Sequence, residues 1–316
     1  MSKPANQANR IIGALLGLAL GDAFGAPFEG GVLERILWRF IGIREGKRRW
    51  TDDTQMTFDL VESLIQCRKV DQGDLANRFA KSYRWSRGYG PGTARVLRRI
   101  RRGEPWKLAS HAVYVNGSYG NGGAMRSPAI GLFFGNHGAD AVAEAAEAAA
   151  IITHAHPLAR EGAVQIALAT ALALEGADQQ QILTQLSERA MSQEFSEKVA
   201  IAKTWLVAGQ DIVPSQVAVR LGRGIAAAES CTTAVYVAMR FLEDTFEDLL
   251  GFTIKIGGDV DTIAAMAGAI WGATRGADEL PQEMLAKLEN HDRLLSLATH
   301  FSEIVEYSVR PTTLCT

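Results

Sequence analysis

The sequence predicts an all-α fold in a single compact domain of many helices. Apolar residues recur at helical spacing along most of the 316 residues, and no stretch sustains the alternation typical of strands. With 47% hydrophobic and 22% charged residues, the composition is that of a globular protein. No repeat and no linker rich in proline or serine divides the chain. We expect residues 1–10 to be a flexible extension and residues 11–310 to form the domain.

The first predicted helix is the apolar run IIGALLGLAL at residues 11–20. Gly13, Gly17 and Gly21 recur every fourth residue, so they share one helix face, where small residues let another helix approach closely. The run is too short to cross a membrane. It has some likeness to the apolar core of a signal peptide. We favour a buried helix, because the acidic residue Asp22 follows directly.

Further helices are expected in order along the chain. Residues 54–67 place Met56, Leu60 and Leu64 at helical spacing. Residues 140–152 consist almost entirely of alanine, valine, isoleucine and glutamate, which are mostly strong helix formers. The remaining predicted helices lie at 159–174, 179–191, 195–208, 225–241, 245–255, 262–274, 281–289 and 292–307.

Charge and cysteine content exclude several classes of protein. The chain has 33 lysines and arginines against 35 aspartates and glutamates, so no global charge attracts it to nucleic acid or to an anionic membrane. Its three cysteines form no Cys-x-x-Cys pair, which argues against a thiolate zinc site and a disulfide framework. We therefore expect a cytoplasmic protein with no membrane partner and no nucleic-acid partner, and a monomer is the default expectation.

The strongest local charge feature is a run of five arginines. These are Arg95, Arg98, Arg99, Arg101 and Arg102. We interpret them as the solvated face of a helix. The alternative is a surface that binds an acidic partner or nucleic acid.

Two clusters of carboxylates stand at the starts of predicted helices, at residues 51–54 (TDDT) and 259–262 (DVDT). One acidic residue is enough to cap a helix, whereas adjacent carboxylates repel one another unless a cation lies between them. Oxygen ligands without sulfur favour Mg²⁺, Mn²⁺ or Ca²⁺ over zinc. Four carboxylates exceed the charge that one ion balances, which suits a two-metal site. Asp22 and Glu29 can add further carboxylates, and spacing alone leaves helix capping as the alternative.

Two further motifs are candidates for ligand binding. The segment 116–126 (NGSYGNGGAMR) has glycines that permit close backbone approach to a ligand. There Tyr119 can stack on a base and the amides can hold phosphate oxygens. The alternative is an ordinary glycine-rich turn, and the motif is not a P-loop. His154-Ala155-His156 lacks a third ligand at metal spacing, so we interpret it as a polar cleft residue or a buried core histidine rather than as a zinc site.

Together these motifs resemble the ADP-ribosylglycohydrolase family, which includes the dinitrogenase-reductase-activating glycohydrolases and the ADP-ribosyl-acceptor hydrolases. The matching stretches run in the family's order from residue 11 to residue 280. They are GALLGLALGDAFGAPFEG, WTDDTQMT, GSYGNGGAMRSPAIGL, THAHPLA, AAESCTTAVYVAMRF and IGGDVDTIAAMAGAIWGA. The resemblance implies an all-α domain with a central cleft and two Mg²⁺ ions at its base, replaced by Mn²⁺ in some members.

The resemblance also implies roles for individual residues. The expected metal ligands are Thr51, Asp52, Asp53, Asp259, Asp261 and Thr262. The residues expected to bind ADP-ribose are Gly117, Ser118, Tyr119, Gly120, Asn121, Gly122 and His154. The candidates for handling the proton of the leaving group or of water are Glu29, Asp52 and Asp259. The choice among these three carboxylates stays open.

The activity implied is that of a metal-dependent hydrolase that removes ADP-ribose from a modified acceptor. We expect arginine-linked ADP-ribose on protein. The alternatives are ADP-ribosyl-serine, a small conjugate such as O-acetyl-ADP-ribose, or a non-catalytic member that binds ADP-ribose or is structural. The chain departs from the family pattern in two places. Many members have an acidic residue where residues 85–90 read WSRGYG, and some have a phenylalanine where Val113 and Tyr114 stand.

Overall fold

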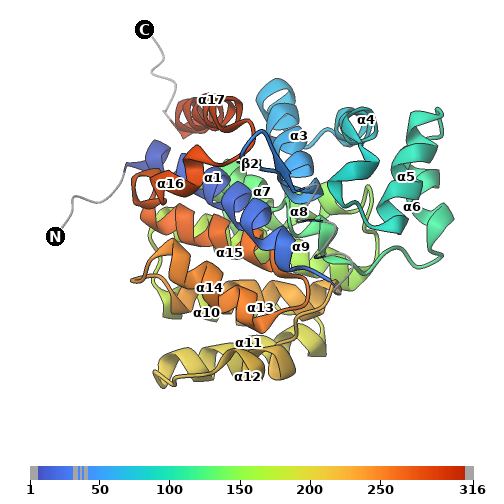
Figure 1. The fold of residues 1–316 in the computed structure, drawn as a ribbon. Helices are drawn as coiled ribbons and strands as arrows, with labels where there is room; N and C mark the ends of the chain where they lie inside the picture. Colours follow the sequence, from blue (N-terminus) through green and yellow to red (C-terminus); the bar gives the residue numbers. More distant parts are fainter. Residues whose placement is uncertain (1–5, 31–34, 36–37, 39–41, 310–316) are drawn as a thin grey trace, which may run out of the picture.

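The computed structural model describes residues 6–30, 35, 38 and 42–309, which form a helical domain (Figure 1). The helices of ten residues or more are α1 (Gln7–Gly25), α3 (Asp52–Cys67), α4 (Gln72–Ser82), α5 (Pro91–Arg101), α8 (Ala139–Ala150), α9 (Pro157–Glu175), α10 (Gln179–Glu188), α11 (Gln193–Val207), α13 (Ala227–Arg240), α14 (Phe246–Ile256), α15 (Val260–Arg275) and α17 (His291–Val309). The shorter ones are α6 (Trp106–Val113), α7 (Pro128–Phe134), α12 (Pro214–Arg220) and α16 (Gln282–Ala286), with 3₁₀ turns η1 (Ala26–Phe28), η2 (Trp85–Arg87), η3 (Asn121–Gly123), η4 (Gly135–His137) and η5 (Ala277–Glu279). Strands β1 (Ile43–Arg44) and β2 (Lys47–Arg48) form a small antiparallel ribbon. The prediction of an all-α domain with little or no sheet is confirmed.

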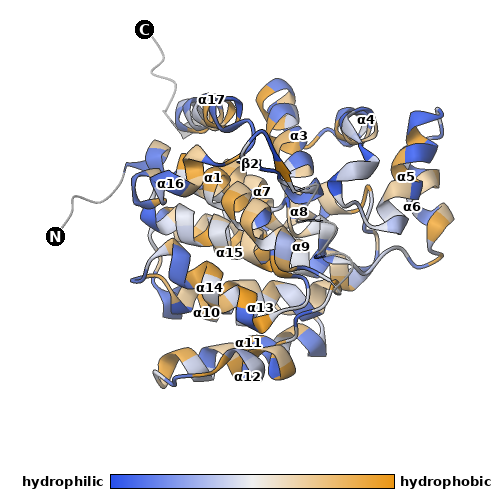
Figure 2. Ribbon diagram, viewed as in Figure 1, coloured by the Kyte–Doolittle hydropathy of each residue, from blue (hydrophilic) through white to orange (hydrophobic). Residues whose placement is uncertain are grey.

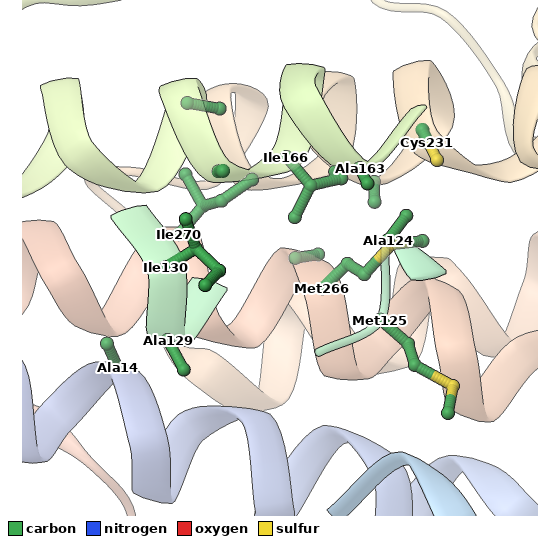
Figure 3. Close-up of a cluster of buried hydrophobic side chains, with 14 of the residues drawn as sticks. Ala14, Ala124, Met125, Ala129, Ile130, Ala163, Ile166, Cys231, Met266 and Ile270 are labelled. Carbon is green, nitrogen blue, oxygen red and sulfur yellow. The ribbon is translucent and has the colours of Figure 1, made fainter. Parts of the chain in front are cut away.

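Helix α15 lies at the centre of the domain. It packs against α1 and against α9, α13 and α14, while α7 and α8 pack on α9. Figure 3 shows the core where α7, α9 and α15 meet, with Ile130, Ile166, Met266 and Ile270 all buried. Helices α4 and α5 lie to one side of this centre, and Figure 2 shows hydrophilic residues on their surfaces. Burying the faces of the central helices is the main source of stability.

Helix α1 is a core helix of the domain. By length and composition alone it could cross a membrane, but 78% of its apolar window is buried inside the domain. Its glycines meet the backbone of α15. A Cβ atom added at Gly17 would lie 2.4 Å from the carbonyl oxygen of Gly268, and one added at Gly13 would lie 2.7 Å from that of Gly272. The predicted close contact between a glycine face and another helix is confirmed.

The expected N-terminal extension at 1–10 overlaps the start of α1. The Asn6 side chain accepts a hydrogen bond at 2.7 Å from the backbone N–H three residues on and so caps the helix. Residues 7–10 therefore belong to α1. Residues 1–5 and the expected domain end at 310 lie outside the described residues.

All the predicted helices are present, with ends shifted by a few residues, except that 281–289 contains only the short α16. Among the described residues, helices α4, α6, α7 and α12 were not predicted, and α5 was expected only as a helix with the arginine run on its solvated face. Helices α6, α7 and α12 have eight residues or fewer, too short for periodicity to stand out. In α5 the arginines at 95, 98, 99 and 101 are exposed, which confirms the interpretation of a solvated helix face.

Candidate functional site

Carboxylates from three helices meet at one place in the domain. Oxygen atoms of Asp22, Asp53 and Asp261, from α1, α3 and α15, all lie within 4.8 Å of one another. Oxygen atoms of Glu29, Asp259 and Asp261 satisfy the same limit. Asp261 belongs to both groups, so the two groups adjoin. Each group has three carboxylates, a donor set suited to a hard divalent cation.

Helix capping does not account for the carboxylates at the start of α3. The cap is the hydroxyl of Thr51, which accepts a hydrogen bond from the N–H of Asp53 at 3.2 Å. The side chain of Asp259, at the corresponding position of α15, makes no capping hydrogen bond. Of the aspartates that follow these caps, Asp261 accepts a hydrogen bond from the N–H of Thr262 at 2.9 Å through one oxygen, whereas Asp53 Oδ2 accepts none among the described residues.

Asp22 connects α1 to the start of α3 by hydrogen bonds. It is fully buried, and its carboxylate accepts hydrogen bonds from the N–H groups of Thr51 at 2.9 Å and Thr54 at 3.0 Å. It also accepts one from the hydroxyl of Thr54 at 2.5 Å. From sequence, Asp22 was only a supplementary carboxylate, although a charged residue inside an apolar helix is a signal of function or pairing.

The buried aspartates of the cluster have no cationic side chain paired with them among the described residues. No ion pair joins Asp22, Asp53, Asp259 or Asp261 to a basic side chain in the described part of the chain. The Oδ2 atom of Asp53 is buried and accepts no hydrogen bond within the described residues. Its other oxygen lies 3.4 Å from the hydroxyl of Thr262, which is also buried. These oxygens fit a divalent cation, because such an ion would satisfy the orphaned acceptor and the excess charge.

Burial and the closeness of the carboxylates also raise their pKa values. Burial raises the pKa of Asp52, Asp53 and Asp261 well above the usual range, and repulsion from neighbouring carboxylates adds to the effect. Burial also raises the pKa of Asp22 and Asp259, although their hydrogen bonds oppose it. The protein without metal therefore holds protons at this cluster above the pH at which a free aspartate loses them.

Asn121 links the glycine-rich loop to the carboxylates. Its side-chain amide donates to Asp259 Oδ2 at 2.5 Å and to the hydroxyl of Ser230 at 3.0 Å. Asn121 is 7% exposed. The residue that we expected to contact ADP-ribose thus orients one of the expected metal ligands in this structure.

The glycine-rich loop wraps around the Thr153–His156 segment. Gly117 has φ 77°, and a Cβ atom there would lie 2.5 Å from the backbone nitrogen of His156. A Cβ atom at Gly122 would lie 2.5 Å from the ring of His154, and one at Gly120 would lie 3.4 Å from it. Only glycine fits at residues 117 and 122. The glycine-rich loop and the Thr153–His156 segment are therefore packed together as one unit.

Two further residues shape this loop. The hydroxyl of Ser118 accepts from the N–H of Gly120 at 3.3 Å and so holds the turn. Tyr119 is 57% exposed, with its ring edge-on to His156 at 6.2 Å between centroids. With more than half of its surface exposed, this ring can stack on a planar ligand.

His154 is a buried neutral imidazole. It is 5% exposed, and its Nδ1 lies 2.8 Å from the hydroxyl of Thr153. Burial, with a smaller effect of the nearby Arg126 charge, lowers the pKa of His154 to about 3. His154 therefore carries no charge near neutral pH. This agrees with the interpretation of a buried or cleft histidine.

Sequence reasoning gave no role to Arg126, which holds the loop in place. This fully buried side chain donates to the carbonyl of Gly122, to the carbonyl of Ala149 at 2.9 Å and to the hydroxyl of Thr153 at 3.0 Å. Burial lowers the pKa of its guanidinium to about 9. Arg126 thus joins the loop to the end of α8.

The segment that departs from the family pattern lies beside Asp52. A Cβ atom at Gly88 would be 3.6 Å from Asp52 Oδ1. Its neighbour Arg87 turns away, donating to the Trp50 carbonyl at 2.7 Å and pairing with Glu289 at 2.6 Å. The chain therefore has a glycine, with no side chain, next to this carboxylate. Tyr114, at the other departure, is 45% exposed.

Comparison with known proteins gives a consistent result over nearly the whole chain. The family model described as ADP-ribosylglycohydrolase matches residues 3–310. ADP-ribosylhydrolase ARH3 of Danio rerio is 32% identical over 342 residues, covering 95% of this chain and 92% of that protein. The ADP-ribosyl-(dinitrogen reductase) glycohydrolase of Rhodospirillum rubrum is 28% identical, covering 89% of this chain and 90% of that protein. A solved chain of an ADP-ribosylglycohydrolase-related protein complex has a TM-score of 0.71 at 26% identity, covering 95% of this chain and 99% of that one.

Proposed function

The chain belongs to the ADP-ribosylglycohydrolase family and is a glycohydrolase, and we propose that it releases ADP-ribose from arginine side chains of modified proteins. The observation that carries this proposal is the pair of adjoining carboxylate groups that share Asp261. Asn121 connects this cluster to the glycine-rich loop. A sugar bound at the carboxylates and a diphosphate bound at the loop amides would therefore belong to one ligand.

The same cluster is where we propose that two Mg²⁺ or Mn²⁺ ions bind. The expected ligands Thr51, Asp52, Asp53, Asp259, Asp261 and Thr262 lie at the starts of α3 and α15, and Asp22 and Glu29 supply further oxygens. Divalent cations supply Lewis-acid polarisation of water and of sugar hydroxyl groups. The orphaned oxygen of Asp53 and the unbalanced charge support this assignment.

Residues around the cluster would bind the ADP-ribose, orient the metal ligands and transfer protons. Tyr119 offers an exposed ring to the adenine, while neutral His154 lines the loop without adding charge. Asn121 already engages Asp259, whereas Glu29 and Asp52 are only half-buried. Glu29 and Asp52 are therefore the better placed of the three candidate carboxylates to pass a proton between the leaving group and solvent.

The charge of the site supports an arginine-linked substrate. A guanidinium leaving group is cationic, and the aspartates at 22, 53, 259 and 261 form no ion pair with a basic side chain among the described residues. Gly88 leaves the space next to Asp52 free of a side chain. The Rhodospirillum rubrum relative acts, by its name, on an ADP-ribosylated protein. We further expect the protein to act as a cytoplasmic monomer.

The test is release of ADP-ribose from an arginine-ADP-ribosylated protein and, in parallel, from a serine-linked one. Each substrate is incubated with Mg²⁺, with Mn²⁺ and with EDTA. We expect metal-dependent release from arginine, its loss in Asp261→Asn, and full activity in Asp244→Asn, a change at an exposed aspartate. Release from serine alone, or equal release in EDTA, would reject the arginine linkage or the metal requirement respectively.

A further inference from the structure

A basic groove lies between helices α5 and α6, outside the carboxylate site. Its volume is about 410 Å³. It is lined by Arg95, Arg98, Arg99, Arg102, Ala112 and Val113. Among the described residues that line it none is acidic, so four arginines surround one hollow with a small apolar floor.

The arginines form one stripe along α5 and its C-cap. They recur at intervals of three and four residues, which places them on a single helix face. The opposite face, with Val96, Leu97 and Ile100, is buried. The arginines are exposed on the face that lines the groove.

Most of this positive charge has no partner. Arg99 pairs with Glu104 at 2.7 Å, and Arg98 donates only to the carbonyl oxygen of Ala94. The side chains of Arg95 and Arg102 make no hydrogen bond or ion pair with the described residues. Three of the four guanidinium groups therefore stay available to an anionic ligand, and arginine is suited to bidentate pairing with carboxylates.

Both ends of the α5–α6 unit contact the proposed active site. Before α5, Gly88 lies against Asp52, and after α6, Gly117 packs on the backbone of His156. Between them, the ring of Tyr114 covers Gly92 at the start of α5. A ligand in the groove therefore binds on a unit whose two ends adjoin the carboxylates and the glycine-rich loop.

We propose that this groove docks an acidic segment of the ADP-ribosylated protein, and this rests on the proposed function. The stripe spans about 10 Å, since seven residues of helix rise 1.5 Å each. That length suits two carboxylates on alternate residues of an extended peptide, about 7 Å apart. A protein that binds nucleic acid usually has a broad basic face. This chain has a net charge of −2, and its arginine stripe is short, which favours an acidic peptide. Leu108 and Val115 near the groove are 63% and 92% exposed, which fits contact with a protein.

The experiment measures binding without hydrolysis, by fluorescence anisotropy at low salt. The probes are an unmodified fluorescein-labelled peptide (Glu-Ala)₄, the neutral peptide (Gln-Ala)₄ and the oligonucleotide dT₈. The variant is Arg95→Glu with Arg98→Glu and Arg102→Glu, and the single Arg95→Glu is made in case the triple variant fails to fold. The matched control reverses three exposed charges elsewhere, as Arg68→Glu with Lys69→Glu and Arg220→Glu.

We expect the acidic peptide to bind about tenfold more tightly than the neutral one, and the triple variant to lose about tenfold in affinity while the control does not. The single variant should lose part of this affinity, and added salt should weaken binding. Hydrolysis of free ADP-ribosyl-arginine should be unchanged in the groove variants. Equal affinity for the two peptides, an equal loss in the control, or tighter binding of dT₈ would overturn the proposal. None of these outcomes depends on whether the wild type hydrolyses its substrate.

Discussion

At the residue scale, the decisive feature is a set of carboxylates held together against their own repulsion. Asp53 and Asp261 are buried, and both have a pKa raised well above the usual range by burial and by neighbouring charge. Hydrogen bonds from backbone amides hold Asp22 in place, and the amide of Asn121 holds Asp259. The rest of the fold must therefore offset the cost of bringing these groups together.

Replacing Asp261 with asparagine should stabilise the metal-free protein and weaken metal binding. Asp261 belongs to both candidate metal groups, so its neutral variant relieves repulsion in each. Without metal, we expect Asp261→Asn to melt above the wild type, by roughly 1–2 °C for each kcal/mol of repulsion removed. With Mg²⁺ added, only the wild type should gain stability. Differential scanning calorimetry in EDTA and in Mg²⁺ checks both parts, and a lower melting temperature for the variant in EDTA would contradict the repulsion.

Asp59 should make the stability depend on pH. Burial raises the pKa of this carboxyl to about 7, although it accepts hydrogen bonds from Ser82 and Gln55. The folded state thus binds a proton more tightly than the unfolded state, whose aspartate titrates near 3.9. The free energy of unfolding should therefore fall as pH rises from about 4 to about 7 and be level above that.

The variant Asp59→Asn removes this contribution. A pKa difference of about 3 between the folded and unfolded states corresponds to about 4 kcal/mol. This is the upper limit for the increase in the free energy of unfolding of the variant over the wild type above pH 7. Urea unfolding in EDTA at pH 5, 6, 7 and 8 measures the difference, with Asp244→Asn as the exposed control. A constant difference across this range would reject a raised pKa for Asp59.

Some of the site's residues were predictable from sequence and others were not. The clusters at 51–54 and 259–262 are visible because adjacent carboxylates are rare unless a cation or a helix start explains them. Arg126 gave no such signal, since its partners are backbone carbonyls and a hydroxyl up to 27 residues away. The same holds for the contacts of Asp22 with Thr51 and Thr54, which form only when α1 packs against α3.

At the element scale, the glycine contact between α1 and α15 sets the spacing of the site. A Cβ atom at Gly21 would lie 2.2 Å from the carbonyl oxygen of Ala264, which is backbone and cannot rotate away. Asp22 follows Gly21 on α1, and Asp261 lies one turn before Ala264 on α15. The closeness of the two helices therefore places these carboxylates together.

Gly21→Ala should consequently harm both stability and metal binding. We expect a loss of about 1–3 kcal/mol in the free energy of unfolding, because the added methyl group forces two packed helices apart. Mg²⁺ affinity should fall as well, since the carboxylates of the two helices separate. The control is Gly251→Ala in α14, where nothing lies within 4 Å and alanine should stabilise by up to about 1 kcal/mol. Urea unfolding and Mg²⁺ titration check both variants, and unchanged stability in Gly21→Ala would contradict this helix contact.

Helix prediction succeeded where the apolar period was strong and failed where charge obscured it. The pattern at 54–67 gave α3 to within two residues at its start. Helix α5 was recognised only from its arginine run and without bounds, because arginines dominate its sequence, yet Val96, Leu97 and Ile100 are buried at helical spacing. The order of packing around α15 was beyond sequence reasoning, because it depends on contacts between segments that lie far apart in the chain.

At the scale of the whole molecule, the folded core holds a charge cluster that opposes folding. Helix α1 packs along α15 over a long stretch, α3 touches both, and each of the three contributes at least one carboxylate to the site. Burial of their apolar faces stabilises the arrangement, whereas the carboxylates destabilise it wherever they are ionised. A bound divalent cation should therefore act on the stability of the entire domain.

The stabilisation by Mg²⁺ should grow with pH. Protons and Mg²⁺ compete for the same oxygens, and the raised pKa values of Asp52, Asp53 and Asp261 keep protons bound above the usual range. At a concentration of about 100 times Kd, one site contributes about 2.7 kcal/mol. The rise in Tm on adding Mg²⁺ should thus be small at pH 5 and several degrees at pH 8.

Differential scanning fluorimetry at both pH values, with NaCl at matched ionic strength, measures this effect. The salt control is needed because screening alone weakens repulsion between charges. Asp261→Asn should lose most of the rise at pH 8, since this residue serves both candidate groups. An equal rise with NaCl, or a rise that persists undiminished in the variant, would mean that the carboxylates are tolerated by the fold without binding a cation. A rise specific to divalent ions and lost in the variant would mean that the domain reaches its full stability only with its metal bound.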